Sequence, residues 1–199
     1  KPLSGFLDRV ADAQNYALGQ RSDTKGLEGL MYTEAGKAPD PKAVAEKKAW
    51  EDCGLQLDFP EGMLFLVLKP GLMLPTVGTM VSDGMRRYLQ ICKKEDANPW
   101  SEDAGLLITP KELADRCVSW DAFLKDYPDF PFKKEITEKR KNYVGSLLIG
   151  ENNTPAFDYD GAKAASSEFK EAWEWVLKTN AGTYTGKIVK EWRDMIKPG

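Results

Sequence analysis

Histidine is absent from this chain of 199 residues. Its absence excludes Ser-His-Asp and Cys-His nucleophilic machinery, the commonest general base of enzymes, and every zinc site that requires imidazole. The three cysteines, Cys53, Cys92 and Cys117, lie far apart and form no Cys-x-x-Cys pair. They therefore indicate neither a secreted disulfide framework nor a metal knuckle. We accordingly expect no catalytic residue, no bound metal and no cofactor.

A charge excess is also missing. The chain carries 28 basic and 31 acidic side chains, a net charge of -3, which argues against a dedicated nucleic-acid binder. Its 42% hydrophobic and 30% charged residues are typical of a globular protein. The length suits one substantial domain or two small ones.

No long apolar run is uninterrupted. Residues 63–81 contain a single ionised side chain, Lys69, but Pro70, Gly71 and Pro75 break the segment, so we expect no transmembrane helix. Lys69, Pro70 and Gly71 suit a tight turn. Two interpretations stay open for this segment. In the first, the segment is buried, as a hairpin or as an extended stretch that crosses the core. In the second, it presents an apolar lobe to a partner or a membrane surface.

The C-terminal half has the periodicity of helices. Thr109, Pro110 and Glu112 match a capping box with proline at the first helical position, and this helix should end before Pro128. Three more helices are expected at about 131–148, from a cap at Asp160 to about 180, and from about 185 to just before 198. Short connections between them predict a helical bundle over 98–199.

The N-terminal half, 1–97, is richer in loops. Its apolar spacing predicts an opening helix over about 6–17, and Asp40 followed by Pro41 predicts a helix that ends near Gly54. Ser82 is expected to cap a further helix, and 98–101 to form a loop between the halves. The fold class is thus mainly α, an irregular multi-helix bundle with room for one short β-hairpin. The two halves could also form one continuous domain.

Aromatic and basic residues mark two possible surfaces. Trp173 and Trp175 point to different faces of one predicted helix, so an inward Trp173 would leave Trp175 lateral or exposed, as interface anchors are. The helix over 131–148 carries a basic face, with Tyr143 nearby, that could meet an acidic partner or anionic headgroups. That face comprises Lys133, Lys134, Lys139, Arg140 and Lys141.

These features predict a non-catalytic docking or scaffold subunit that attaches to a larger assembly through an apolar segment and surface aromatics. The expected partners are protein subunits, with contact to a membrane surface as an option and no nucleic acid. The start at Lys1 without an initiator methionine suggests a processed or trimmed chain, for which an organellar address, for example in a photosynthetic complex, is an analogy of class alone. The partner-binding residues would be Leu64, Phe65, Leu66, Leu68, Leu72, Met73, Leu74 and Trp175.

Two alternatives remain. In a lipid or pigment carrier, the same apolar segment would line a pocket. In a carboxylate-dependent hydrolase, a pair of acidic side chains would perform acid–base chemistry. Asp58, Glu61 and Asp83 flank the apolar segment, and a carboxyl group beside apolar walls can have a raised pKa.

Overall fold

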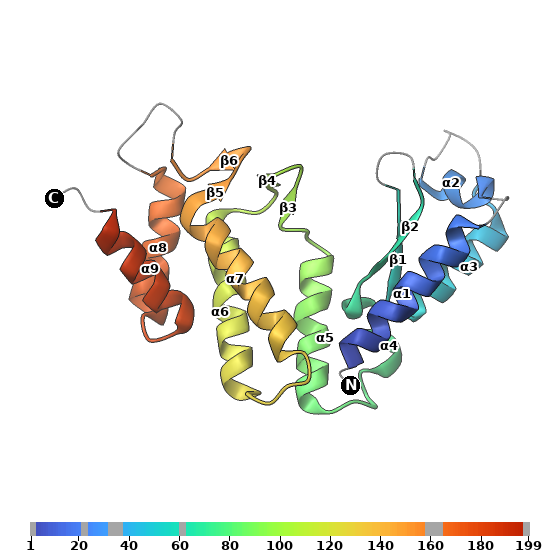
Figure 1. Cartoon of the computed structure of the whole chain (residues 1–199), viewed down its shortest axis with the longest axis horizontal. Coiled ribbons are helices and arrows are strands. Elements are labelled where there is room, and N and C mark those ends of the chain that lie inside the picture. The colour runs from blue at the N-terminus through green and yellow to red at the C-terminus, as the bar shows by residue number, and fades with distance from the viewer. Residues whose placement is uncertain (1–2, 21–23, 32–37, 60–62, 158–164, 197–199) are drawn as a thin grey trace. The chain divides into compact units, whose positions relative to one another are not determined.

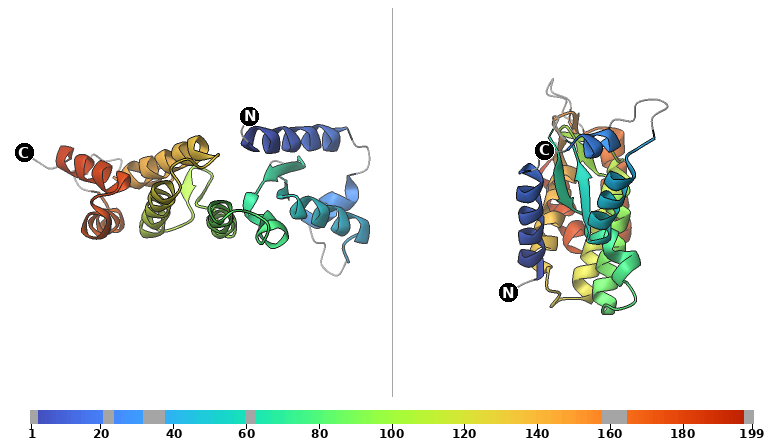
Figure 2. Two further views of the ribbon diagram at one scale, coloured as in Figure 1. Left: turned by 90° about the horizontal axis from the view of Figure 1, so that it is seen from below. Right: turned by 90° about the vertical axis from the view of Figure 1, so that its right-hand side faces the viewer.

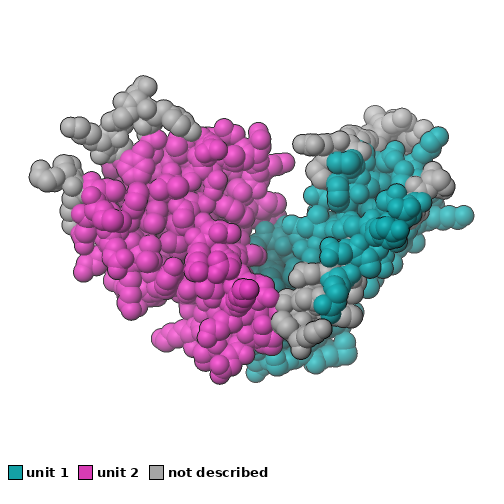
Figure 3. All heavy atoms as spheres, in the orientation of Figure 1, with its two compact units in different colours: residues 1–96 teal, residues 97–199 magenta. Residues whose placement is uncertain are grey.

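A computed structural model describes residues 3–20, 24–31, 38–59, 63–157 and 165–196 (Figure 1). The chain divides into an N-terminal unit, residues 1–96, and a C-terminal unit, residues 97–199 (Figure 3). The described residues form helices and short two-stranded antiparallel sheets, which confirms the predicted mainly α fold class. None of the described helices has both the length and the apolar character needed to cross a membrane.

The N-terminal unit places a β-hairpin between two helices. Strand β1 contacts α3 and strand β2 contacts α1, as the left view of Figure 2 shows. The elements are α1 (Leu3–Gly19), α2 (Lys25–Met31), α3 (Pro41–Asp52), β1 (Leu55–Asp58), β2 (Phe65–Leu68), the 3-10 helix η2 (Pro70–Met73), α4 (Leu74–Val77) and α5 (Asp83–Asp96).

Helix α3 begins and ends where its sequence signals predict. The Asp40 carboxylate accepts a hydrogen bond from the Lys42 N–H at 2.9 Å, and Pro41 occupies the first turn. After the helix, Gly54 has φ +81°, a conformation that side chains disfavour. A Cβ atom at Gly54 would also lie 2.7 Å from Cγ of Met73, so both conformation and space require glycine here.

Apolar side chains from the hairpin and three helices, most of them leucines, form the core of the N-terminal unit. Its buried members are Leu18, Leu27, Ala43, Leu55, Leu57 and Leu66. The Asn15 side chain of α1 donates to the Leu66 carbonyl at 2.8 Å and accepts from the Leu66 N–H at 2.6 Å. One side-chain amide thereby pairs both backbone groups at the outer edge of β2, which an open sheet edge would leave exposed.

The C-terminal unit is a helical bundle with two small hairpins. Helix α6 contacts α7, α8 and α9, so it is the central helix. The elements are β3 (Ser101–Glu102), β4 (Gly105–Leu106), α6 (Pro110–Asp126), α7 (Lys133–Ile149), β5 (Gly150–Glu151), β6 (Thr154–Pro155), α8 (Ser167–Asn180) and α9 (Tyr184–Met195). Ser101, expected in a loop, instead pairs with Leu106 in a hairpin. The cap expected at Asp160 lies outside the described residues.

The start of α6 and the inward face of α8 agree with the sequence analysis. Thr109 Oγ1 accepts from the Glu112 N–H at 3.2 Å, and the Glu112 carboxylate accepts from the Thr109 N–H at 2.9 Å, which completes the capping box. Trp173 is buried, and its indole N–H donates to the Leu147 carbonyl at 2.7 Å.

A buried ion pair joins three helices of this unit. Asp121 of α6 lies 2.9 Å from a guanidinium nitrogen of Arg140 on α7, and its second oxygen accepts from the buried N–H of Thr185 at the start of α9. The Arg140 guanidinium also lies 3.9 Å from the ring centroid of Tyr184. Arg140 therefore does not belong to an exposed basic face, as the sequence led us to expect.

Tyr143, which lies near that basic face in sequence, is buried, with its ring 5.2 Å from that of Trp100. The remaining basic residues of α7 are exposed, and acidic neighbours compensate some of them. The hydrogen bond that Lys141 donates to Glu138 at 2.9 Å raises the pKa of that lysine.

Candidate docking sites

The apolar segment 63–81 is neither wholly core nor wholly surface. Its first part forms β2, where successive side chains point to opposite sides of the hairpin. Leu66 is only 3% exposed, whereas Phe65 and Val67 are 39% and 36% exposed. The hairpin thus runs from 55 to 68, and segment 63–81 contributes its second strand rather than a hairpin of its own.

The inward side of β2 belongs to the core. Leu64 and Leu68 are partly buried against the same cluster that contains Leu66. Leu66 was predicted to bind a partner, and this placement corrects that assignment, because its side chain is already covered by the chain's own leucines. For Leu64, Leu66 and Leu68, the first interpretation of the segment, as part of the core, therefore applies.

The outward side of β2 forms what we call the hairpin face, Phe65 and Val67. Their cross-strand neighbours on β1 are Asp58 and Gln56, so two polar side chains border the two apolar ones. Met63, two residues before Phe65, is 55% exposed. For Met63, Phe65 and Val67, the second interpretation of the segment, as an exposed apolar surface, therefore applies.

The second part of the segment folds against α5. The expected turn at 69–71 is instead the start of η2, and a Cβ atom on Gly71 would lie 2.3 Å from the Lys93 backbone, so η2 and α5 are in close contact. Three predicted partner-binding residues, Leu72, Met73 and Leu74, are half-buried here.

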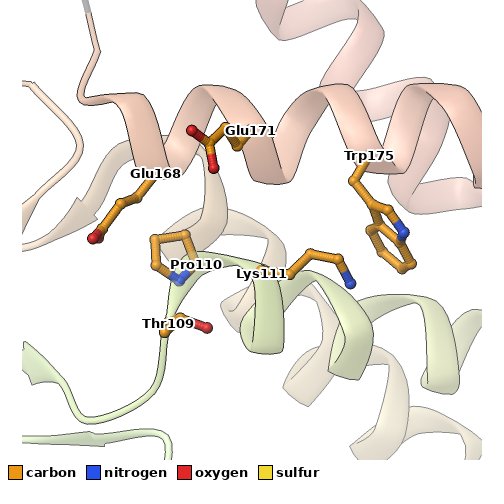
Figure 4. Close-up of a pocket in the computed structure, with 6 residues that line it drawn as sticks. All are labelled: Thr109, Pro110, Lys111, Glu168, Glu171 and Trp175. Carbon is orange, nitrogen blue, oxygen red and sulfur yellow. The ribbon is translucent and has the colours of Figure 1, made fainter.

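A groove in the C-terminal unit contains the remaining predicted partner-binding residue, Trp175. It has a volume of about 440 Å³ and lies between α8 and the start of α6 (Figure 4). Trp175 is half-buried and extends from α8 toward Lys111 of α6. The Lys111 ammonium lies 3.3 Å from the centroid of the indole ring and 2.9 Å from the Asp115 carboxylate. The lining residues are Thr109, Pro110, Lys111, Glu168, Glu171 and Trp175.

The other lining residues were not predicted to form a site with Trp175. The sequence held part of the information, since positions 168, 171 and 175 are three and four residues apart and therefore share one helix face. The contact between this face and the start of α6 depends on the tertiary fold, and no local sequence pattern predicts it. We call this site the Trp175 groove.

The acidic residues considered for hydrolysis are not enclosed. Asp58 is exposed and accepts a hydrogen bond from the N–H of Phe59. The Asp83 side chain is 86% exposed and lies 2.9 Å from Arg86. Neither carboxyl group is enclosed by the apolar segment, and Glu61 lies outside the described residues. Over the described ranges, no three acidic or cysteine side chains are grouped so that they could hold a metal ion.

Comparison with known proteins shows a similarity to a viral polyprotein. The chain is 27% identical over 164 residues to the genome polyprotein of Petunia vein clearing virus (isolate Shepherd), and 27% identical over 166 residues to that of isolate Hohn. Each match covers 81% of this chain but 6% of the polyprotein, so the chain spans a small fraction of the length of these curated relatives. No protein-family model matches the sequence, and no solved structure matches it significantly.

Proposed function

We propose that this chain is a non-catalytic docking module that attaches to a partner protein through the hairpin face. The observation that carries the proposal is the exposure of Phe65 and Val67 side by side on one strand, with Met63 exposed next to them. Single exposed apolar residues are ordinary on protein surfaces, but adjacent ones on a rigid strand form a contiguous patch.

The size of this patch indicates the kind of interface it supports. Complete burial of a phenylalanine or valine side chain contributes about 1.5–3 kcal/mol, and both are already partly covered. The hairpin face alone therefore supplies a few kcal/mol, less than the cost of immobilising two proteins. It would act as the apolar centre of a larger contact with a polar border, to which Asp58 and Gln56 contribute.

Attachment to an organellar complex, including a photosynthetic one, stays a prediction, which subcellular fractionation of the tagged chain tests.

The carrier and hydrolase alternatives have less support. Leu64, Leu66 and Leu68 pack against other leucines of the core, so the inward side of the apolar segment is occupied by protein rather than open to a lipid or pigment. Asp58 and Asp83 are exposed to water and are not enclosed as a pair in a cleft.

The double variant Phe65→Ser/Val67→Ser tests the proposal. Both side chains point away from the core, so the variant should keep the circular dichroism and unfolding midpoint of the parent chain. The parent chain should bind a hydrophobic dye and sediment with a larger assembly in extracts of its native source, and the variant should lose both properties.

The matched control is Leu107→Ser/Ile149→Ser, which removes two side chains that are 53% and 58% exposed in the C-terminal unit. This control should sediment like the parent chain. If the hairpin variant still sediments with the assembly, or if the control loses that property instead, the hairpin face is not the docking surface. Sedimentation with lipid vesicles rather than protein would assign the face to a membrane surface.

A further inference from the structure

The Trp175 groove combines an aromatic platform with two acidic side chains. Glu168 and Glu171 are exposed on the same face of α8 as Trp175, and neither forms an ion pair with any residue in the described parts of the chain. Pro110 completes the lining with an apolar ring at the start of α6 (Figure 4). An aromatic ring, a proline and free carboxylates are the surroundings that a cationic side chain on a peptide prefers.

The indole ring already has a cation next to it. The Lys111 ammonium lies 3.3 Å from the ring centroid, a cation–π contact within the chain itself. Asp115 neutralises that ammonium at 2.9 Å, so Glu168 and Glu171 leave the groove with an excess of negative charge. Lys111 shows that the ring can receive a cation, and its charge is balanced without help from the two glutamates.

An anionic occupant is disfavoured by the same geometry. The starts of α6 and α8 would attract an anion, as free helix N-termini do. At α6, however, the capping box places the Glu112 carboxylate at the helix start and already pairs the N–H groups of Thr109 and Glu112, and Glu168 places a carboxylate in the first turn of α8. A phosphate or an acidic peptide would therefore meet negative charge at both helix starts.

We propose that the Trp175 groove is a second docking site, which binds a short basic segment of a partner protein. An arginine or lysine of that segment would stack on Trp175 and pair with Glu168 or Glu171, and an adjacent apolar residue would contact Pro110. This site lies wholly in the C-terminal unit, so it does not rest on the hairpin face, and either proposal can fail without the other.

The experiment titrates the isotope-labelled full chain with three capped tripeptides, Arg-Leu-Arg, Gln-Leu-Gln and Glu-Leu-Glu. Each of the six tryptophans gives one indole N–H peak in a proton–nitrogen correlation spectrum, and Trp175→Phe assigns the peak of Trp175. The Arg-Leu-Arg peptide should shift that peak with a saturable curve, and the shift should weaken as salt is raised. The other two peptides should leave it in place.

Two exposed-residue variants test the charges separately. Glu168→Gln/Glu171→Gln removes the attraction and should weaken binding about three- to ten-fold, the range expected for two solvent-exposed ion pairs. Lys111→Met removes the competing internal cation and should strengthen binding of the same peptide. The matched control, Glu174→Gln/Glu191→Gln, makes the same change in net charge outside the groove lining and should bind like the parent chain.

Three results would each overturn the proposal. The first is an unshifted Trp175 peak at millimolar Arg-Leu-Arg peptide. The second is equal or tighter binding of Glu-Leu-Glu, which would make the groove an anion site. The third is equal weakening by the groove variant and its control, which would reduce the effect to net charge.

Discussion

Replacing Asp121 with alanine should destabilise the C-terminal unit by about 3–5 kcal/mol, the cost of breaking a buried ion pair from one side. The Asp121 side chain is 4% exposed and that of Arg140 is 12% exposed. The alanine variant would leave the guanidinium enclosed without its carboxylate and would leave the buried N–H of Thr185 without its acceptor. Stacking on Tyr184 remains, but a cation–π contact contributes only about 1–2 kcal/mol.

Asp115→Ala is a closely matched control. Asp115 lies on the same helix, and its carboxylate is also 2.9 Å from a cationic nitrogen, that of Lys111. The two side chains of that pair are 42% and 46% exposed, so its loss should cost less than about 1 kcal/mol. Because residue type, helix and distance are the same, a difference between the two variants measures burial together with the second hydrogen bond, which Asp121 accepts from Thr185.

Urea unfolding followed by tryptophan fluorescence provides the assay. Five of the six tryptophans lie in the C-terminal unit, so the signal reports mainly on that unit. With a denaturant slope of about 2 kcal/mol per molar urea, the midpoint of Asp121→Ala should fall by roughly 1.5–2.5 M. The double variant Asp121→Asn/Arg140→Met, which removes both charges, should recover part of that loss. Equal midpoints for Asp121→Ala and Asp115→Ala would refute the reasoning.

Three further stability predictions follow from individual contacts, each measured by thermal or urea unfolding. Thr109→Ala removes the cap of α6 and should cost about 0.5–2 kcal/mol, whereas Thr109→Ser keeps the hydroxyl and should cost little. Gly71→Ala should cost at least about 1–3 kcal/mol because its Cβ atom would overlap the Lys93 backbone. The control is Gly29→Ala, because a Cβ atom on this helical glycine would have nothing within 4 Å, and the variant should be neutral or stabilising. A larger loss of stability for Gly29→Ala than for Gly71→Ala would contradict the close contact between Gly71 and Lys93. Asn15→Ala unpairs both backbone groups of Leu66 and should cost about 1–3 kcal/mol, against almost nothing for the exposed Gln14→Ala.

The helix starts could be predicted because their causes are local. The carboxylate of Asp40 and the hydroxyl of Thr109 each reach amides two or three residues ahead, and the proline that follows each has the fixed φ of a first turn. Such signals need no knowledge of the rest of the chain. The predicted helix over 131–148 also exists, but its boundary moved by one or two residues, since Phe132 supplies no capping hydrogen bond.

The basic face of α7 shows where local reasoning stops. Arg140 lies four residues after the buried Ile136 and three before the buried Tyr143, so helical spacing places it near the inward face, whereas Lys141 lies further around the helix. The tertiary fold supplies what spacing does not, a partner for the inward charge: Asp121 from α6 reaches Arg140, while Lys141 stays with Glu138 of its own helix. The partner of Arg140 is 19 residues away in sequence, and no spacing rule identifies it.

The apolar segment illustrates the same limit at the candidate docking surface. From composition, Phe65, Leu66 and Val67 are equivalent, and the choice between core and surface seemed to apply to all of them together. Pairing with β1 removes that equivalence, because a strand places alternate side chains on opposite sides. Only one side faces the core cluster, to which Leu18 of α1, Leu27 of α2 and Ala43 of α3 contribute. A shift of one residue in the register would bury Phe65 and expose Leu66. The exposure of the hairpin face is therefore a consequence of the β1–β2 register, and the two hydrogen bonds between the Asn15 side chain and the Leu66 backbone help to fix that register.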